Sequence, residues 1–239
     1  MAIQRITAKY SWPKQLPVLS DEQKRAREDF MLHWHKVLPG KYGMIERFNH
    51  RGAFTEPIQP GTRTLEIGAG IGAHIEFEDL SLQTYVANEL REEMAAEIKK
   101  RFPQVEVLIG DVQAGLPCES ASFDRVLAVH VLEHLPRLPD ALAEIRRVLK
   151  SDGFFQVVIP CEGSLAYTLA RNISARREFE KRNNMSYDFV VESEHVNLAH
   201  EIVFALKKQF TVERKKFFPL NIVPIQACNL VISLLCRPK

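Results

Sequence analysis

The sequence predicts an α/β protein with a doubly wound, largely parallel sheet, a C-terminal antiparallel strand pair and a helical N-terminal cap. Two observations lead to this prediction. Short apolar strands alternate with amphipathic helices from residue 61 to residue 160, and the last two apolar runs follow each other without a helix between them. The 239-residue chain is 46% hydrophobic and 26% charged, which is ordinary for a globular protein and excludes extensive disorder.

Residues 1–60 are predicted to form an irregular arm followed by the helical cap. Ser20, with two acidic residues behind it, is typical of a helix start, and Pro39–Gly40 predicts that this helix ends near Val37. A second short helix or an ordered loop is expected over residues 41–54, before prolines mark a boundary.

The main domain is assigned to residues 61–239, and its elements follow the alternation of strand and helix patterns. Strands are expected over residues 64–67, 84–87, 105–109, 124–129 and 154–159, with helices over 91–102 and 139–149. The last third contains predicted helices over 164–182 and 200–208, then strands over 210–218 and 229–236. Because no crossover helix separates the last two strands, they should pair antiparallel.

Charge and cysteine content limit the cellular context. The net charge of +2 is too balanced to indicate a general nucleic-acid binder, and the N-terminus has no apolar segment typical of a secretory signal. We expect a cytoplasmic protein without a membrane span. The cysteines form no C-x-x-C pair and are expected to be reduced thiols; they are Cys118, Cys161, Cys228 and Cys236.

A glycine-rich loop directly after the first predicted strand is the most informative segment. Gly68, Gly70 and Gly72 stand at alternate positions behind the strand over residues 64–67. Glycine is needed where the backbone turns tightly and approaches a ligand closely, and the carboxyl end of a first parallel strand borders the ligand crevice of open α/β sheets. The alternative is a glycine-rich turn without a ligand.

Two acidic residues stand where a nucleoside site needs them. Glu89 ends the second predicted strand, where a carboxylate can accept hydrogen bonds from both ribose hydroxyls. Asp111 follows the third strand and could accept from the exocyclic amine of adenine, while Val112 offers its backbone N–H. Each acid alone could equally serve a helix start or a turn, but together they predict an adenosine pocket.

The choice of adenosine cofactor depends on the loop itself. Gly68, Gly70 and Ala73 would satisfy the G-x-G-x-x-G/A fingerprint of nicotinamide enzymes. Glu66 and Gly72 instead make residues 65–73 resemble the acid-x-Gly-x-Gly-x-Gly motif of class I S-adenosylmethionine-dependent methyltransferases. A pyrophosphate favours a helix N-terminus without an acid, whereas Glu66 can help to bind the ammonium of the methionine end, directly or through water.

The resemblance to this family extends from about residue 61 to residue 237. It implies a Rossmann-like, seven-stranded sheet, S-adenosylmethionine as cofactor with S-adenosylhomocysteine as product, and methyl transfer to an oxygen or nitrogen. Asn88 departs from the family pattern, in which an apolar or small residue is commoner before the acid. The positions that the resemblance assigns to the cofactor are Glu66, Gly68, Ala69, Gly70, Gly72, Glu89, Leu90, Asp111, Val112, Val129 and His130.

Two histidines are candidates for the base that removes a proton from the methyl acceptor. His130 follows the fourth predicted strand, in a loop that the resemblance places beside the sulfonium. His195 precedes the helix over residues 200–208 and is our first choice if the acceptor is a hydroxyl. A packing or hydrogen-bonding role is the alternative for each histidine.

The loop after the fourth strand also has a metal-ligand pattern. His130, Glu133 and His134, with His195 downstream, are similar to the Glu-x-x-Glu-His plus distal His set with which small-RNA 3′-end methyltransferases bind a divalent metal. The first position here is His instead of Glu, and no basic RNA-binding face is evident. We therefore expect no metal, and a structural role for Glu133 and His134.

Two segments are expected to build the acceptor side, namely the cap and a lid insertion over residues 161–200. The basic residues of the lid helix either pair with acidic neighbours, which we favour, or bind a phosphate or carboxylate; they are Arg171, Arg176, Arg177, Lys181 and Arg182. Aromatic residues near the cap either cover the acceptor pocket or dock the cap; they are Tyr10, Trp12, Trp34, Tyr42 and Phe48.

These observations predict a methyltransferase whose acceptor is a small molecule, a glycan or a lipid-linked precursor. No charge-rich tail or nucleic-acid module is evident, so we expect no nucleic-acid partner. The alternatives are an RNA methyltransferase, an NAD(P)-dependent oxidoreductase and a non-catalytic relative. The sequence indicates neither the oligomeric state nor whether the acceptor atom is oxygen or nitrogen.

Overall fold

The computed structural model describes residues 10–41, 43–52, 56–223 and 225–239 and contains one seven-stranded sheet. The strand order is β3-β2-β1-β4-β5-β7-β6, and β7 runs antiparallel to both of its neighbours. The predicted sheet, including its antiparallel C-terminal pair, is confirmed. The strands are β1 Thr62–Ile67, β2 Gln83–Glu89, β3 Glu106–Ile109, β4 Phe123–Val129, β5 Leu149–Pro160, β6 Phe210–Phe218 and β7 Val231–Pro238.

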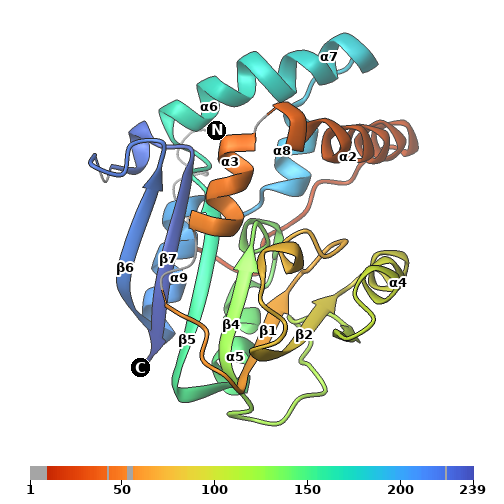
Figure 1. The fold of residues 1–239 in the computed structure, drawn as a ribbon. Coiled ribbons are helices and arrows are strands. Elements are labelled where there is room, and N and C mark those ends of the chain that lie inside the picture. The colour runs from red at the N-terminus through yellow and green to blue at the C-terminus, as the bar shows by residue number, and fades with distance from the viewer. Residues whose placement is uncertain (1–9, 42, 53–55, 224) are drawn as a thin grey trace.

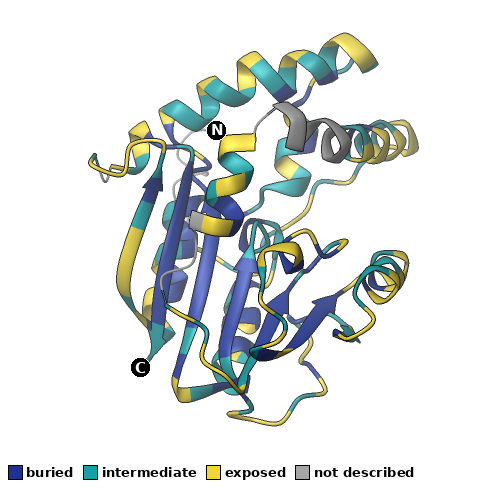
Figure 2. Cartoon of the chain, in the orientation of Figure 1, coloured by how far each residue is buried: buried dark blue, intermediate teal, exposed yellow. Residues whose placement is uncertain are grey.

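Helices cover both faces of the sheet (Figure 1). On one face, α5 (Leu138–Val148) and α9 (Ala199–Gln209) bury their apolar sides in the largest core cluster. On the other face, α4 (Glu92–Arg101) packs with the short 3-10 helix η2 (Ile75–Phe77) against β2, β3 and β4. The buried strands between these layers appear as the dark centre of Figure 2.

A helical layer lies beyond the carboxyl ends of the parallel strands and covers that edge of the sheet (Figure 1). The N-terminal cap and the lid insertion build this layer together, because Phe30 packs edge-on against Phe179, with ring centroids 5.1 Å apart, and also contacts Tyr187. The elements are α2 Asp21–Lys41, α3 Gly43–Arg47, the π-helical turn η1 Phe48–Gly52, α6 Leu165–Arg171, the π-helical turn η4 Asn172–Arg176, α7 Arg177–Asn183 and α8 Asp188–Glu194.

Several predicted boundaries need correction. Helix α2 continues to Lys41, past the end predicted near Val37, because proline removes one backbone donor without preventing helical dihedrals at neighbouring residues. Strand β5 starts at Leu149, five residues before the predicted Phe154, since Leu149 already pairs with Phe123 of β4. The lid helix predicted over residues 164–182 is interrupted by η4, and α8 was not predicted.

The segment behind the glycine loop and the cysteines agree with the sequence analysis. The segment behind Gly72 forms only η2, as expected, and all four cysteines are free thiols. Two further 3-10 turns, η3 (Leu132–His134) and η5 (Gln226–Cys228), follow β4 and precede β7. In the described part of the chain, no helix has the length and apolar character needed to cross a bilayer.

Candidate functional site

The glycine loop lies at the carboxyl end of β1 and has one open face. Gly68 and Gly70 have φ angles of 65° and 58°, which side chains other than glycine rarely adopt. A Cβ atom on Gly68 would lie 2.6 Å from Cγ2 of Val131, so this position is closed by packing. A Cβ atom on Gly70 would meet nothing within 4 Å. The loop therefore leaves space for a ligand directly above Gly70.

Glu89 connects the end of β2 to this loop. Its Oε2 accepts a hydrogen bond of 2.8 Å from the backbone N–H of Gly70, and its Oε1 accepts one of 3.1 Å from that of Arg91. The carboxylate is almost fully buried and thus held at the edge of the open space. Its predicted role in binding ribose hydroxyls stays a prediction, and this position fits it.

The residues predicted to contact adenine lie at the end of β3. Asp111 accepts a hydrogen bond of 2.9 Å from the backbone N–H of Gln113, and its Oδ2 lies 3.5 Å from Nη2 of Arg137. Val112 is buried beside it, whereas the Leu90 side chain behind β2 is exposed. The carboxyl ends of β1, β2 and β3 thus bring together the glycines and both acids, as a nucleoside pocket requires.

Glu66 has a different environment from the other predicted cofactor residues. Its carboxyl is 3% exposed and accepts a hydrogen bond of 2.8 Å from the hydroxyl of Tyr85 on β2. Burial raises the pKa of Glu66 to about 8, so its neutral form is favoured at pH 7. Tyr85 holds the Glu66 side chain inside the sheet. The predicted contact of Glu66 with an ammonium group stays a prediction.

His130 marks the end of β4, directly after Val129. Its φ angle of 54° is uncommon for a residue with a side chain, and such conformations cluster at functional sites. Nδ1 of His130 lies 3.2 Å from Oε1 of the buried Glu133. Burial raises the pKa of Glu133, but the histidines around it outweigh this effect and hold the pKa below its ordinary value. Glu133 is therefore an anion that orients His130.

His195 is oriented by a carboxylate that sequence analysis missed. Its Nδ1 lies 2.7 Å from Oε2 of Glu162, whose other oxygen pairs with Arg171. Burial lowers the pKa of His195, but the hydrogen bond and charge of Glu162 outweigh it, so the pKa is raised. Glu162 stands two residues after β5, and the rule that identified Glu89 and Asp111, an acid behind a strand end, could have found it.

A second histidine lies beside His195. Their rings are 5.2 Å apart, and Nδ1 of His134 lies 2.5 Å from the carbonyl oxygen of Glu194. One ligand atom each from Glu133, His134 and His195 lies within 4.8 Å of the others, a grouping that could hold a metal ion. The absence of a metal remains a prediction, which chelation can test.

The contacts of the lid favour charge pairing for part of its basic surface. Arg176 pairs with Glu180 and Asp188, and Arg171 pairs with Glu162. The remaining three predicted basic residues are exposed on the outer face, namely Arg177, Lys181 and Arg182.

Three of the five aromatic residues near the cap dock structural elements. Tyr10 packs on Phe204 of α9, the indole N–H of Trp12 donates to Asn197 over 2.8 Å, and Phe48 contacts Phe218. The side chain of Trp34 and all of Tyr42 lie outside what the structure describes.

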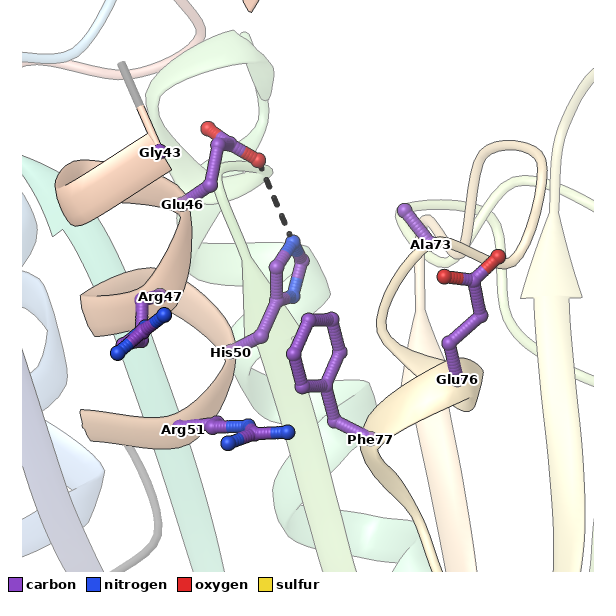
Figure 3. Close-up of a pocket in the computed structure, with 8 residues that line it drawn as sticks. All are labelled: Gly43, Glu46, Arg47, His50, Arg51, Ala73, Glu76 and Phe77. Atoms are coloured by element: carbon purple, nitrogen blue, oxygen red, sulfur yellow. Dashed lines mark ion pairs between the residues drawn. The ribbon is translucent and has the colours of Figure 1, made fainter. Parts of the chain in front are cut away.

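A cavity of about 350 Å³ lies between η1 and the segment that follows the glycine loop (Figure 3). Its volume is within the range of small-molecule sites. No residue of the cap had been predicted to bind a ligand through a charged group. The lining residues are Gly43, Glu46, Arg47, His50, Arg51, Ala73, Glu76 and Phe77.

The fold and the site together define a Rossmann-like methyltransferase architecture, and comparisons with known proteins agree. Residues 65–157 match the family model of a methyltransferase domain. Two solved structures show the same fold. The [4+2]-cyclase SpnF has a TM-score of 0.63 at 14% identity, covering 95% of this chain and 99% of that one. A possible histamine N-methyltransferase of Thermotoga maritima has a TM-score of 0.60 at 21% identity, covering 90% of this chain and 99% of that one.

Curated relatives match about half of the chain. A sterol 24-C-methyltransferase of Schizosaccharomyces pombe is 30% identical over 119 residues, 47% of this chain and 32% of that protein. A probable phthiotriol/phenolphthiotriol dimycocerosates methyltransferase of Mycobacterium ulcerans is 32% identical over 139 residues, 53% of each protein. The chain thus spans between about a third and a half of the length of these relatives. Residues 65–157 are thus similar to a methyltransferase domain, and the sheet has the Rossmann-like fold of solved S-adenosylmethionine-dependent methyltransferases.

Proposed function

We propose that this protein transfers a methyl group from S-adenosylmethionine to an oxygen or nitrogen of a small-molecule, glycan or lipid-linked acceptor. The observation that carries this proposal is the contact between Glu89 and Gly70, next to a loop position that is open to a ligand. The relatives named as sterol and lipid methyltransferases support an apolar or lipid-linked acceptor. A cyclase shares the fold, so the reaction must be inferred from the site.

The chain's own residues would divide the work between two sides of the carboxyl edge. Glu89 and Asp111 would hold the nucleoside by its ribose and adenine, with Gly70 allowing close approach. The bound cofactor supplies a methyl group on a sulfonium. Alignment of the acceptor with that group would account for much of the rate. For a hydroxyl acceptor a base is also needed, and His195 and His130 are the candidates predicted from the sequence.

The nicotinamide alternative loses its support. Its fingerprint depended on Ala73 completing a helix-start motif, but η2 is a single turn and the antiparallel β7 belongs to the methyltransferase sheet. No described feature favours RNA as acceptor over a smaller molecule.

Isothermal titration with S-adenosylhomocysteine, with NADH in parallel, tests the cofactor part of this proposal. We expect micromolar binding of S-adenosylhomocysteine and no heat with NADH. Binding of NADH alone would overturn the proposal, and binding of neither would favour a non-catalytic relative. A positive result is followed by transfer of a radiolabelled methyl group to a panel of hydroxyl and amine acceptors, and transfer to tRNA alone would favour the RNA methyltransferase instead.

A further inference from the structure

The cavity between η1 and the segment Ala73–Phe77 is lined by one histidine, His50, which is distinct from His130 and His195 (Figure 3). His50 lines this cavity, and its ring stacks on Phe77 with centroids 4.9 Å apart and planes 13° apart. Because Ala73 directly follows Gly72, the cavity begins where the cofactor loop ends. This feature belongs neither to the His195 cluster nor to the predicted cofactor residues.

A chain of buried polar contacts leads from the interior to His50. Nη1 of Arg125 donates to both oxygens of Glu78 over 2.9 Å. Oε1 of Glu78 lies 2.7 Å from Nε2 of His74, and Nδ1 of His74 lies 3.1 Å from Nδ1 of His50. Arg125, Glu78 and His74 are each at most 2% exposed, so this chain is shielded from water.

The chain fixes which nitrogen of each imidazole carries hydrogen. The pKa of Glu78 stays low despite burial, because His74 and Arg125 stabilise its anion, so it accepts from Nε2–H of His74. Burial lowers the pKa of His74 more than Glu78 raises it, so His74 is neutral and its Nδ1 carries a lone pair. That lone pair can only accept, and Nδ1 of His50 must donate. A neutral His50 therefore has its lone pair on Nε2.

Glu46 is the carboxylate that faces this free nitrogen. Its Oε2 lies 3.5 Å from Nε2 of His50, and the contact is drawn in Figure 3. The neighbouring His50 lowers the pKa of Glu46, and the charge of His130 lowers it further. A proton received by Nε2 would thus be stabilised by an anion.

Two arginines give the cavity a positive wall. Arg47 and Arg51 are exposed, stand one helical turn apart, and both line the cavity. The guanidinium of Arg51 lies 5.5 Å from the centre of the Phe77 ring. Guanidinium groups bind phosphate and carboxylate with two parallel hydrogen bonds, so this wall selects an anionic group.

We propose that this cavity binds a methyl acceptor carrying a phosphate or carboxylate, and that His50 is the residue that accepts the proton of its reacting hydroxyl. This inference rests on the proposed function and moves the proton-accepting role from His195 to His50. A lone pair of the acceptor oxygen forms the new bond to the methyl carbon as the carbon–sulfur bond breaks, with its electron pair remaining on sulfur. The hydroxyl proton passes to Nε2 of His50, where Glu46 stabilises the cation.

Nitrogen-15 NMR of the imidazoles tests the tautomers without any acceptor. We expect Nδ1–H on neutral His50 and Nε2–H on His74, with assignments made from His50→Gln and His74→Gln. The opposite tautomer at His50 would overturn the assignment of the proton acceptor.

Binding of inorganic phosphate and of glucuronate tests the anion wall and separates the two anionic groups. We expect at least one of them to bind and shift the His50 signals, with about tenfold weaker binding in the Arg47→Gln/Arg51→Gln double variant. If neither probe binds, or the double variant binds equally well, the proposed acceptor class is wrong. S-adenosylhomocysteine binding is measured on the same samples. If the wild-type protein does not bind S-adenosylhomocysteine, the proposed function itself has failed, and not only the proposed acceptor class.

Methyl transfer to sugar phosphates and sugar acids, compared with the neutral sugars, tests the reaction. We expect transfer to the anionic compounds, and about 100-fold lower kcat in His50→Gln with unchanged S-adenosylhomocysteine affinity. His33→Gln is the matched control, because His33 pairs with Glu178 on the outer helical layer. Transfer only to neutral compounds, or equal kcat in His50→Gln, would overturn the proposal. Thermal unfolding of each variant shows whether a loss reflects misfolding.

Discussion

The two sides of the sheet's carboxyl edge are built in different ways. On the cofactor side, most of the predicted contacts lie in one stretch, from Glu66 to Val112, at or just behind the carboxyl ends of β1, β2 and β3. On the acceptor side, His50, His130 and His195 come from the cap, from the end of β4 and from the lid, and buried polar side chains orient them. The cofactor side is thus a local property of strand ends, and the acceptor side is a product of long-range packing.

This difference explains what could be predicted from the sequence. The glycines and acids of the cofactor side were found because a strand end is visible as an apolar run followed by a polar residue. Glu162 obeys the same rule but was missed, because it was counted as the first part of the lid. The contact between His50 and His74 joins residues 24 positions apart, with β1 between them in the chain, and no local pattern encodes it.

The largest effect is expected from closing the open face of the glycine loop. Gly70→Ala adds a methyl group where φ is 58° and where the cofactor would lie, so affinity for S-adenosylhomocysteine should fall more than ~100-fold. Gly61→Ala is the matched control, with a φ of 87° and open space outside the site. Calorimetry should show strong binding in this control. Equal binding by Gly70→Ala would mean that the cofactor lies elsewhere.

Next in size is the loss of the nucleoside-binding acids. Glu89→Ala removes both the predicted ribose contacts and the support of Gly70, and Asp111→Ala removes the predicted adenine contact. Each should weaken S-adenosylhomocysteine binding by ~10- to 100-fold, the effect of losing a charged hydrogen-bonding group. Glu92→Ala, an acid at the start of α4, controls for the change in charge. Unchanged affinity in both variants would refute the pocket assignment.

On the acceptor side, Glu162→Gln tests whether the Glu162 carboxylate controls the pKa of His195. The pKa of His195 is raised by Glu162, so the variant should lower this pKa, as measured by NMR titration. Because the folded-state pKa is raised, the pair stabilises the fold at low pH, and this contribution is lost as pH rises through that pKa. An unshifted titration would show that Glu162 does not control the pKa of His195 and would assign the shift to the charge of Glu133.

A smaller effect, on thermal stability, shows whether Glu66 is a buried structural acid or a cofactor ligand. The pKa of Glu66 is raised to about 8 by burial, so its ionisation costs stability increasingly as pH rises from its ordinary value near 4.5 toward 8. Glu66→Gln should therefore raise Tm by a few degrees at pH 8 and leave it nearly unchanged at pH 4. Calorimetric scans at both pH values check this. A large loss of S-adenosylhomocysteine affinity in the variant would instead support the ammonium contact.

The smallest effect is expected from removal of metal ions. Glu133, His134 and His195 are grouped, but Nε2 of His134 lies 4.0 Å from Oε1 of Glu133. Two ligands of a tetrahedral zinc ion at ~2.1 Å lie only about 3.4 Å apart. Nδ1 of His195 is also engaged by Glu162. Methyl transfer should therefore survive dialysis against EDTA, with no metal found by elemental analysis. Activity that is lost with EDTA and returns with added zinc would show that Glu133, His134 and His195 bind a metal ion. His134→Gln would then abolish the recovery.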